Sequence, residues 1–234
     1  MSFLLVLPSA SIQSADDVDL EALTVAVAAN FLAAAQYLGT QYSIENKENI
    51  EFVTGSTGVL TAQVTRGAPY DVLLAADRER PKQLIRQGYA LANAECYARG
   101  ALVLVGAESL SDLQALGKRR LAIASPRTAP YGRAALEVLQ SLEVELPVEQ
   151  ILTGSNVNQA FRFQQSGNAA FALVAQSLDL QAVLVPENLY APVLQFGVVV
   201  RSSDHPRRAK RFLRWLGDDP AQQQLASLGY RRCS

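Results

Sequence analysis

Short apolar runs alternate along the chain with longer segments in which apolar residues recur every three or four positions. The short runs are typical of buried strands, and the longer spacing is typical of one face of a helix. The pattern first predicts a strand at 23–29 and a helix at 31–42. The same pair is expected four more times, with strands at 50–53, 121–124, 151–152 and 170–174 and helical segments at 59–67, 133–142, 158–167 and 175–183. The sequence therefore predicts five strand-to-helix turns.

Strands and helices that alternate in this way are typical of an α/β fold, in which parallel sheets carry helices on both faces. Further strands are expected at 72–75, 101–105 and 196–200. Two helices are expected to end the chain, the first from Pro206 and the second from Pro220. Asp77 and Glu79 are expected to cap a helix that follows Pro81. Ligands of such folds bind at the carboxyl ends of the strands, which makes the turns the candidate site.

The five turns carry small, amide and hydroxyl residues, and paired carboxylates are missing from them. Asn30 stands where the N-cap of the first helix belongs. The segment GSTG at 55–58 is followed by no lysine and does not match the GxSxG spacing, so it is neither a phosphate-binding P-loop nor a nucleophile elbow. Helix starts with free N–H groups and neutral donors can bind an oxyanion without basic residues. Four converging helix starts would supply on the order of two positive charges.

The length, net charge and residue composition of the chain exclude several classes of function. The chain has 234 residues, which fits one large domain or two small lobes, and a net charge of -1, which argues against a nucleic acid or an anionic membrane as partner. No apolar run is long enough to span a membrane. With one histidine, His205 in a polar loop, and two cysteines, neither a metal centre nor a catalytic site is expected. We therefore expect neither an enzyme nor a bound cofactor. The basic run at 207–214 is interpreted as the solvated face of an amphipathic helix.

The first 22 residues combine a short apolar stretch with small and then acidic residues, and they are interpreted as a leader remnant or a disordered tail. Export is the favoured interpretation of this segment. In an exported protein Cys96 and Cys233 could form a disulfide, but two unpaired thiols fit the sequence equally well.

Several of these segments together resemble the periplasmic molybdate-binding proteins of ABC-type molybdate importers, which belong to the two-lobed periplasmic binding protein superfamily. The resemblance covers residues 23–230, and its most specific part is the combination of GAPYDV at 67–72, APYG at 129–132 and NVNQA at 156–160. It is also carried by VAVAANFLAAA at 25–35, GSTGVLTAQVTRG at 55–67, FALVAQS at 171–177 and the ending FLRWLGDDPAQQQLASLGY at 212–230.

The resemblance implies a type II periplasmic binding protein fold, in which each lobe is a mainly parallel sheet flanked by helices. The first lobe would comprise 23–97 and 194–234, and the second lobe 98–193, with chain crossings near 97–100 and 188–194. It further implies a monomeric periplasmic receptor that captures molybdate or tungstate between its lobes and delivers the anion to an ABC transporter permease. No cofactor, nucleic acid or membrane insertion is implied.

The site residues implied by the resemblance come from four turns. They are Ala29 and Asn30, Ser56 or Thr57, Tyr131, and Val157 through its backbone N–H. The chain departs from many family members at Ala175, where those members have a tyrosine, and Tyr131 is expected to supply that hydroxyl instead. Because such a site has donors and no carboxylate acceptor, it should reject hydrogen phosphate. Two alternatives stay open: binding of another tetrahedral dianion such as sulfate, and a cytoplasmic oxyanion sensor on the same scaffold.

Overall fold

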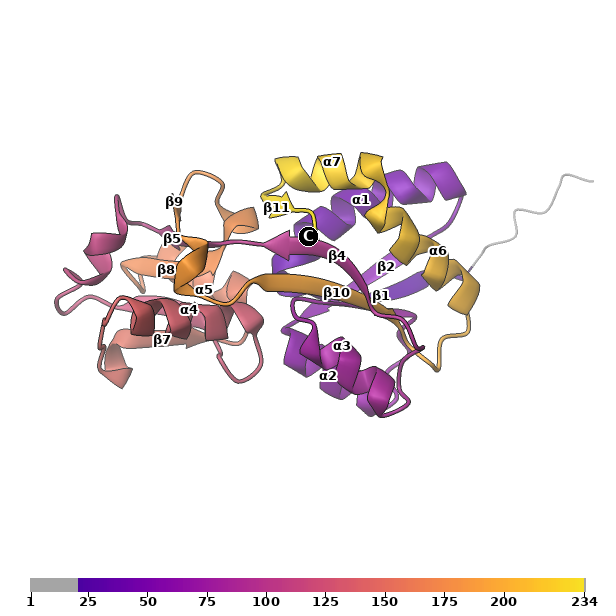
Figure 1. The fold of residues 1–234 in the computed structure, drawn as a ribbon, viewed down its shortest axis with the longest axis horizontal. Helices are drawn as coiled ribbons and strands as arrows, with labels where there is room; N and C mark the ends of the chain where they lie inside the picture. The colour runs from indigo at the N-terminus through magenta and orange to yellow at the C-terminus, as the bar shows by residue number, and fades with distance from the viewer. Residues whose placement is uncertain (1–20, 234) are drawn as a thin grey trace, which may run out of the picture.

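The computed structural model describes residues 21–233, which fold into two lobes, each built around its own sheet (Figure 1). The predicted leader or tail lies outside the described residues except for its last two positions, 21 and 22. The predicted two-lobed α/β fold is confirmed.

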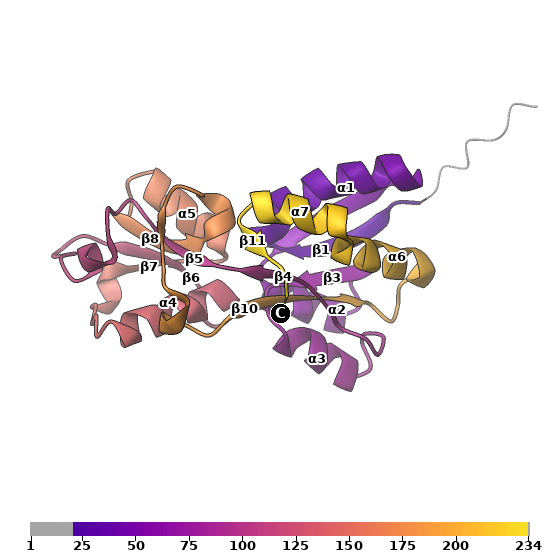
Figure 2. The same ribbon diagram turned by 45° about the horizontal axis from the view of Figure 1, so that its top comes forward.

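The first lobe has a six-stranded sheet in the order β11-β4-β10-β3-β1-β2. Its strands are β1 (Leu23–Ala28), β2 (Ile50–Gly55), β3 (Val72–Ala75), β4 (Glu95–Gly100), β10 (Val193–Val199) and β11 (Tyr230–Arg231). Its helices are α1 (Leu32–Asn46), α2 (Thr57–Thr65), α3 (Glu79–Arg86), α6 (Pro206–Gly217) and α7 (Asp219–Ser227). Helices α1, α6 and α7 bury one apolar cluster against the sheet, whereas α2 and α3 bury another cluster on its opposite face (Figure 2).

The second lobe has a five-stranded sheet in the order β7-β6-β8-β5-β9. Its strands are β5 (Leu102–Val105), β6 (Leu121–Ala124), β7 (Ile151–Gly154), β8 (Phe171–Ala175) and β9 (Val183–Leu184). Helices α4 (Pro130–Ser141) and α5 (Val157–Gln165) pack against this sheet. Five single-turn 3-10 helices complete the described elements: η1 (Ala29–Phe31), η2 (Leu110–Leu113), η3 (Val148–Gln150), η4 (Gln176–Leu178) and η5 (Glu187–Leu189).

Both sheets are mixed, but most strands of each run in one direction, as predicted: β1 to β4 in the first lobe and β6 to β9 in the second, with β10, β11 and β5 running the opposite way. The strands joined by crossover helices are parallel, as in the pairs β1 with β2, β1 with β3, β6 with β7 and β6 with β8. The strands that link the lobes and their edge neighbours pair antiparallel. The physical reason is their connection: a strand that enters its sheet without a crossover helix is free to run in the opposite direction.

Two local predictions need correction. The fifth expected helix, at 175–183, is only the single turn η4, after which the chain extends at Asp179 and forms β9. Strand β4 was not predicted from the apolar pattern, because only two of its six residues, Tyr97 and Ala98, are buried hydrophobic residues. The capping expected of Asp77 and Glu79 is also corrected: Asp77 Oδ1 accepts from the Arg80 N–H at 3.0 Å, but the N-cap residue is Arg78, and Glu79 is itself the first residue of the helix.

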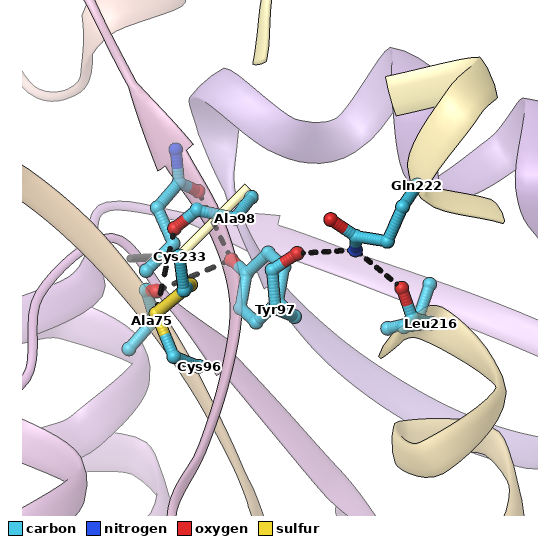
Figure 3. Close-up of a disulfide and its surroundings, with 8 residues drawn as sticks. Ala75, Cys96, Tyr97, Ala98, Leu216, Gln222 and Cys233 are labelled. Atoms are coloured by element: carbon cyan, nitrogen blue, oxygen red, sulfur yellow. Dashed lines mark hydrogen bonds between the residues drawn. A yellow bond between two sulfur atoms is a disulfide. The ribbon is translucent and has the colours of Figure 1, made fainter. Parts of the chain in front are cut away.

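Cys96 and Cys233 form a disulfide, with their Cα atoms 6.1 Å apart (Figure 3). The sequence left open whether these two cysteines form a disulfide or remain unpaired thiols, and the structure shows the disulfide. It fastens the C-terminal segment to β4, where β11 pairs Tyr230 with Gly100. Because the two cysteines are 137 residues apart, closing this loop restricts the unfolded chain strongly, by at most about 5 kcal/mol in the chain-entropy treatment.

Candidate functional site

A small cavity lies between the two lobes, where four strands end and four helical segments begin. Its lining comes mainly from the turns after β1, β2, β6 and β7, and Ala76 after β3 completes it. All six residues that the sequence singled out line it: Ala29, Asn30, Ser56, Thr57, Tyr131 and Val157. The other lining residues are Ala28, Ala76, Ala129, Pro130 and Asn156. We call this space the interlobe cavity.

Asn30 lies in η1, at the end of β1, and exposes 3% of its surface. The sequence placed it as an N-cap, which is wrong: the residue before η1 is Ala28, and no side chain caps this turn. Instead, Asn30 Nδ2 donates to Gln195 Oε1 at 3.0 Å. Its backbone carbonyl accepts from Ser177 Oγ at 3.0 Å and from the Tyr230 hydroxyl at 2.6 Å. Asn30 is therefore held at both its side chain and its backbone.

Ser56 and Thr57 open helix α2, and their hydroxyl groups differ in what they contact. Thr57 Oγ1 accepts from the Ala76 N–H at 3.0 Å, so this oxygen takes part in the fold of the lobe. Ser56 is the N-cap residue, yet its side chain caps no N–H, and its buried Oγ has no hydrogen-bond partner among residues 21–233. A buried hydroxyl without a partner costs about 1–3 kcal/mol. Within residues 21–233, Ser56 Oγ is the only hydroxyl oxygen of the lining that is buried without any hydrogen-bond partner.

Tyr131 enters the cavity from the first turn of α4, where Pro130 begins the helix. Its hydroxyl accepts from Gln195 Nε2 at 3.3 Å. Burial raises the pKa of Tyr131 well above its usual value, so the hydroxyl keeps its proton and remains a donor. Ala175 ends β8 and is not among the lining residues, so Tyr131 supplies the only phenol hydroxyl in this lining.

Val157 is the first residue of α5, where backbone N–H groups lack partners inside the helix. The side chain of Asn156 accepts from the Gln159 N–H at 3.0 Å, and Gln159 Oε1 accepts from the Ser155 N–H at 2.5 Å. Neither of these two bonds uses the N–H of Val157, which lines the cavity. At this position a hydrophobic residue can contribute a backbone donor.

Among residues 21–233, no carboxylate lines the interlobe cavity. The nearest acidic residue along the chain is Asp77, next to the lining residue Ala76, and it pairs with Arg80 at 2.5 Å and with Arg133 at 3.1 Å. The four helix starts that converge on the cavity contribute positive partial charge. The arrangement therefore presents hydrogen-bond donors and a positive potential to whatever occupies it.

The lobes are in contact on both sides of this cavity. The Gly58 N–H of the first lobe donates to the Thr128 carbonyl of the second at 2.8 Å. Arg133 of α4 forms its ion pair with Asp77 across the same boundary, and Ser177 reaches Asn30 from the second lobe. Because these bonds join groups of different lobes, the structure has the closed arrangement.

The single histidine and the basic run, which the sequence also singled out, lie away from the cavity. His205 precedes α6, with its Nε2 3.6 Å from Glu21. The basic run Arg207, Arg208, Lys210, Arg211 and Arg214 lies on α6, with Arg208 and Arg211 paired to the buried Glu48. Four of these five side chains are exposed, in agreement with a solvated helix face. Within 21–233 there is no cluster of metal-ligating side chains, and no helix is long and apolar enough to cross a membrane.

Sequence reasoning missed the residues that hold the lining in place, above all Gln195, Ser177 and Tyr230. Gln195 carried a usable signal, because it is an uncharged polar residue within the apolar segment VLQFGVVV at 193–200. Ser177 and Tyr230 carried none, since their role depends on contacts with the Asn30 carbonyl from distant parts of the chain, Ser177 from the second lobe and Tyr230 from within the first.

Comparison with known proteins gives consistent results. The family model for bacterial extracellular solute-binding proteins matches residues 23–231. The molybdate-binding protein ModA of Rhodobacter capsulatus is 36% identical over 217 residues, which cover 88% of this chain and 86% of that protein. ModA of Azotobacter vinelandii is 32% identical, with 88% of each chain covered. The solved periplasmic molybdate-binding protein of Azotobacter vinelandii superposes with a TM-score of 0.85 at 30% identity, covering 91% of this chain and 100% of the other.

Proposed function

Because the chain belongs to the bacterial extracellular solute-binding proteins, we propose that it captures molybdate or tungstate in the interlobe cavity and presents the closed, loaded form to an ABC transporter permease. The observation that carries the proposal is the lining itself: neutral donors from four helix starts surround the cavity, and no carboxylate lines it. Helix starts and uncharged donors are suited to a tetrahedral dianion.

In this proposal Ser56, Asn30 and Tyr131 donate to the anion through their side chains, and Ala29 and Val157 through their backbone N–H groups. Ser56 is the first choice of direct contact because its buried Oγ has no partner in the described chain; Thr57 Oγ1 accepts from the Ala76 N–H and keeps its own proton, so it can donate as well. An oxyanion would supply the acceptor that Ser56 lacks.

The donor-only lining also predicts selectivity. Molybdate and tungstate carry no proton at neutral pH, so each oxygen can accept. Hydrogen phosphate carries a proton that would need an acceptor, and the side chains of the lining offer no carboxylate for it. Sulfate has the same charge and shape as molybdate, so its discrimination depends on size.

The proposed setting is the periplasm, with the protein acting as a monomer that needs no cofactor and catalyses no reaction. The Cys96–Cys233 disulfide supports this location, because disulfides persist in oxidising compartments. Its relatives include proteins described as periplasmic molybdate-binding proteins.

A thermal-unfolding panel with molybdate, tungstate, sulfate and phosphate tests the proposal. At a ligand concentration 100 times the dissociation constant, binding adds about 2.7 kcal/mol to the free energy of unfolding. We expect stabilisation by molybdate and tungstate and none by phosphate. A flat response to all four anions would refute the proposal, and a response to sulfate alone would make the protein a sulfate receptor. Asn30→Ala and Tyr131→Phe should each weaken binding by about 1–3 kcal/mol.

A further inference from the structure

Gln195 lies on β10, one of the strands that carry the chain between the lobes, and its surface is 0% exposed. A fully buried amide requires hydrogen-bond partners for both its oxygen and its nitrogen. Gln195 finds them in Asn30, Tyr97 and Tyr131. Two of these three partners line the interlobe cavity, one from each lobe.

The chemistry of the amide fixes the direction of each bond. The Gln195 oxygen can only accept, and it takes one proton from Asn30 Nδ2 at 3.0 Å. The Gln195 nitrogen can only donate, and it gives a proton to the Tyr131 hydroxyl at 3.3 Å. Tyr131 therefore uses a lone pair in this contact and keeps its own proton for another acceptor. Asn30 Nδ2 likewise keeps its second proton.

If the Gln195 side-chain amide were rotated so that its oxygen and nitrogen exchanged places, these hydrogen bonds would be lost. With Asn30 in its observed orientation, the Gln195 nitrogen would then face the Asn30 nitrogen, donor against donor, and the Gln195 oxygen would accept from the Tyr131 hydroxyl. In the observed orientation the Tyr97 hydroxyl lies 3.0 Å from the Gln195 oxygen and 3.2 Å from the Ala75 carbonyl oxygen, so its single proton is shared between these two acceptors. The orientation of Gln195 thus determines whether Asn30 and Tyr131 both donate into the cavity.

The backbone around Gln195 is shaped to allow these contacts. The pairing of β10 with β4 shifts at Gln195, because Tyr97 is an extra residue between the partners Cys96 and Ala98. Such a bulge redirects a side chain, here the buried ring of Tyr97. Gly100, on the same strand, leaves room for Tyr131: a Cβ there would lie 1.9 Å from the Tyr131 hydroxyl and 2.8 Å from Gln195 Nε2.

We propose that Gln195 is a positioning residue of the oxyanion site, which fixes Asn30 and Tyr131 as donors and thereby selects a fully deprotonated anion. The inference rests on the proposed function, since it names what sets the direction of that site's donors. Gln195 itself does not line the cavity, so it acts through its two partners.

Calorimetric titration with molybdate tests this role in a double-mutant cycle. We expect Gln195→Met and Tyr131→Phe each to weaken binding by about tenfold or more, the range for hydrogen bonds to charged groups. In the double variant the combined loss should fall well short of the product of the two single losses, because Gln195 acts partly through Tyr131. Losses that multiply, or a Gln195→Met variant that binds as wild type, would overturn the positioning role.

Gln222→Met is the matched control. Gln222 is also a buried glutamine of the first lobe, but its nitrogen donates to the backbone carbonyls of Tyr97 and Leu216, away from the cavity (Figure 3). This variant should lose stability and keep the wild-type affinity. A wild type that does not bind molybdate would refute the proposed function, whereas wild-type binding with an unaffected Gln195→Met variant refutes only the inference.

A second variant covers the case in which Gln195→Met does not fold. In Gln195→Glu the carboxylate can only accept, so the Tyr131 hydroxyl must donate its hydrogen bond to it and can no longer donate into the cavity. When the carboxyl group is protonated, it can donate to Tyr131 as the amide does. The molybdate affinity of this variant relative to wild type should therefore fall between about pH 6 and about pH 9, since burial raises carboxyl pKa values. A ratio that stays constant over this range would contradict the inference.

Discussion

The Ser177 hydroxyl of the second lobe donates to the backbone carbonyl of Asn30 in the first lobe, with a distance of 3.0 Å. The Tyr230 hydroxyl donates to the same carbonyl from within the first lobe. Both lone pairs of this oxygen are thereby used, and one of the two bonds joins the two lobes in the closed arrangement. Ser177 thus links the second lobe to a residue of the interlobe cavity.

Ser177→Ala should therefore weaken the closed form. The loss of one hydrogen bond of about 0.5–1.5 kcal/mol predicts an affinity for molybdate lower by about two- to tenfold, mainly through faster release. Stopped-flow dissociation measures this change. Ser141→Ala is the control, because the Ser141 hydroxyl donates to the Leu189 carbonyl within the second lobe. Equal release rates for the two variants would contradict the assignment.

Gly58→Ala should hold the lobes apart. The Gly58 N–H bonds to the Thr128 carbonyl at 2.8 Å, and a Cβ at Gly58 would lie 3.0 Å from that oxygen and 3.1 Å from the Thr128 Cα. Alanine also favours a helix over glycine by about 1 kcal/mol, so the ligand-free protein should be no less stable. We expect unchanged or higher thermal stability together with weaker binding and incomplete compaction in small-angle scattering.

Gly217→Ala provides the comparison for this variant. Gly217 ends α6, and a Cβ there would meet no atom within 4 Å. This substitution should leave affinity and compaction unchanged. Normal ligand-induced compaction in Gly58→Ala would show that the contact with Thr128 does not limit closure.

The sequence predicted the strand-to-helix turns well because each depends on local information. The strand 121–124 was placed with its observed bounds, and the helix predicted at 133–142 is observed from Pro130 to Ser141. The fifth turn was wrong because the segment at 175–183 has apolar residues at helical spacing, yet it forms η4 and β9. There the pairing of β9 with β5 decides the outcome, and such long-range pairing is not encoded in a local pattern.

Six of the eleven lining residues could be named from the family resemblance, but the way they are held could not. Asparagine is a common residue at helix N-caps. Only the fold shows that the Asn30 side-chain amide instead donates to Gln195, 165 positions later in the chain. Likewise, the sequence does not show that the Ala76 N–H donates to Thr57 Oγ1 while the neighbouring Ser56 Oγ has no partner in the described chain.

Ser56→Ala and Thr57→Val should separate binding from folding. Removal of the unpartnered Ser56 hydroxyl should leave ligand-free stability unchanged or raise it, and should weaken molybdate binding by about 1.5–3 kcal/mol. Thr57→Val keeps the shape but leaves the Ala76 N–H unsatisfied, so it should lower ligand-free stability by about 1–3 kcal/mol. Denaturant unfolding and calorimetry measure both quantities. The reverse pattern would make Thr57 the direct contact.

Stability should fall in alkaline solution because of three buried tyrosines. Burial raises the pKa of Tyr97, Tyr131 and Tyr230 above the usual value of 10.0. Below about pH 10 these phenols are protonated in both the folded and the unfolded chain, so their contribution is constant. Above that pH the unfolded chain releases protons that the folded chain retains, and the free energy of unfolding decreases. Tyrosinate absorbance of the folded protein should show three phenols that ionise only on unfolding; their ionisation near the usual pKa would contradict this.

The disulfide should stabilise the fold and, through the C-terminal strand, the site. Cys96→Ser/Cys233→Ser is expected to lower the free energy of unfolding by about 2–5 kcal/mol, which denaturant titration measures. Because β11 pairs Tyr230 with Gly100 and the Tyr230 hydroxyl bonds to the Asn30 carbonyl at 2.6 Å, loosening this segment should also weaken molybdate binding by a few fold. Wild type treated with a reductant should match the double variant in both respects. Lost stability with full affinity would show that β11 holds Tyr230 in place without the disulfide.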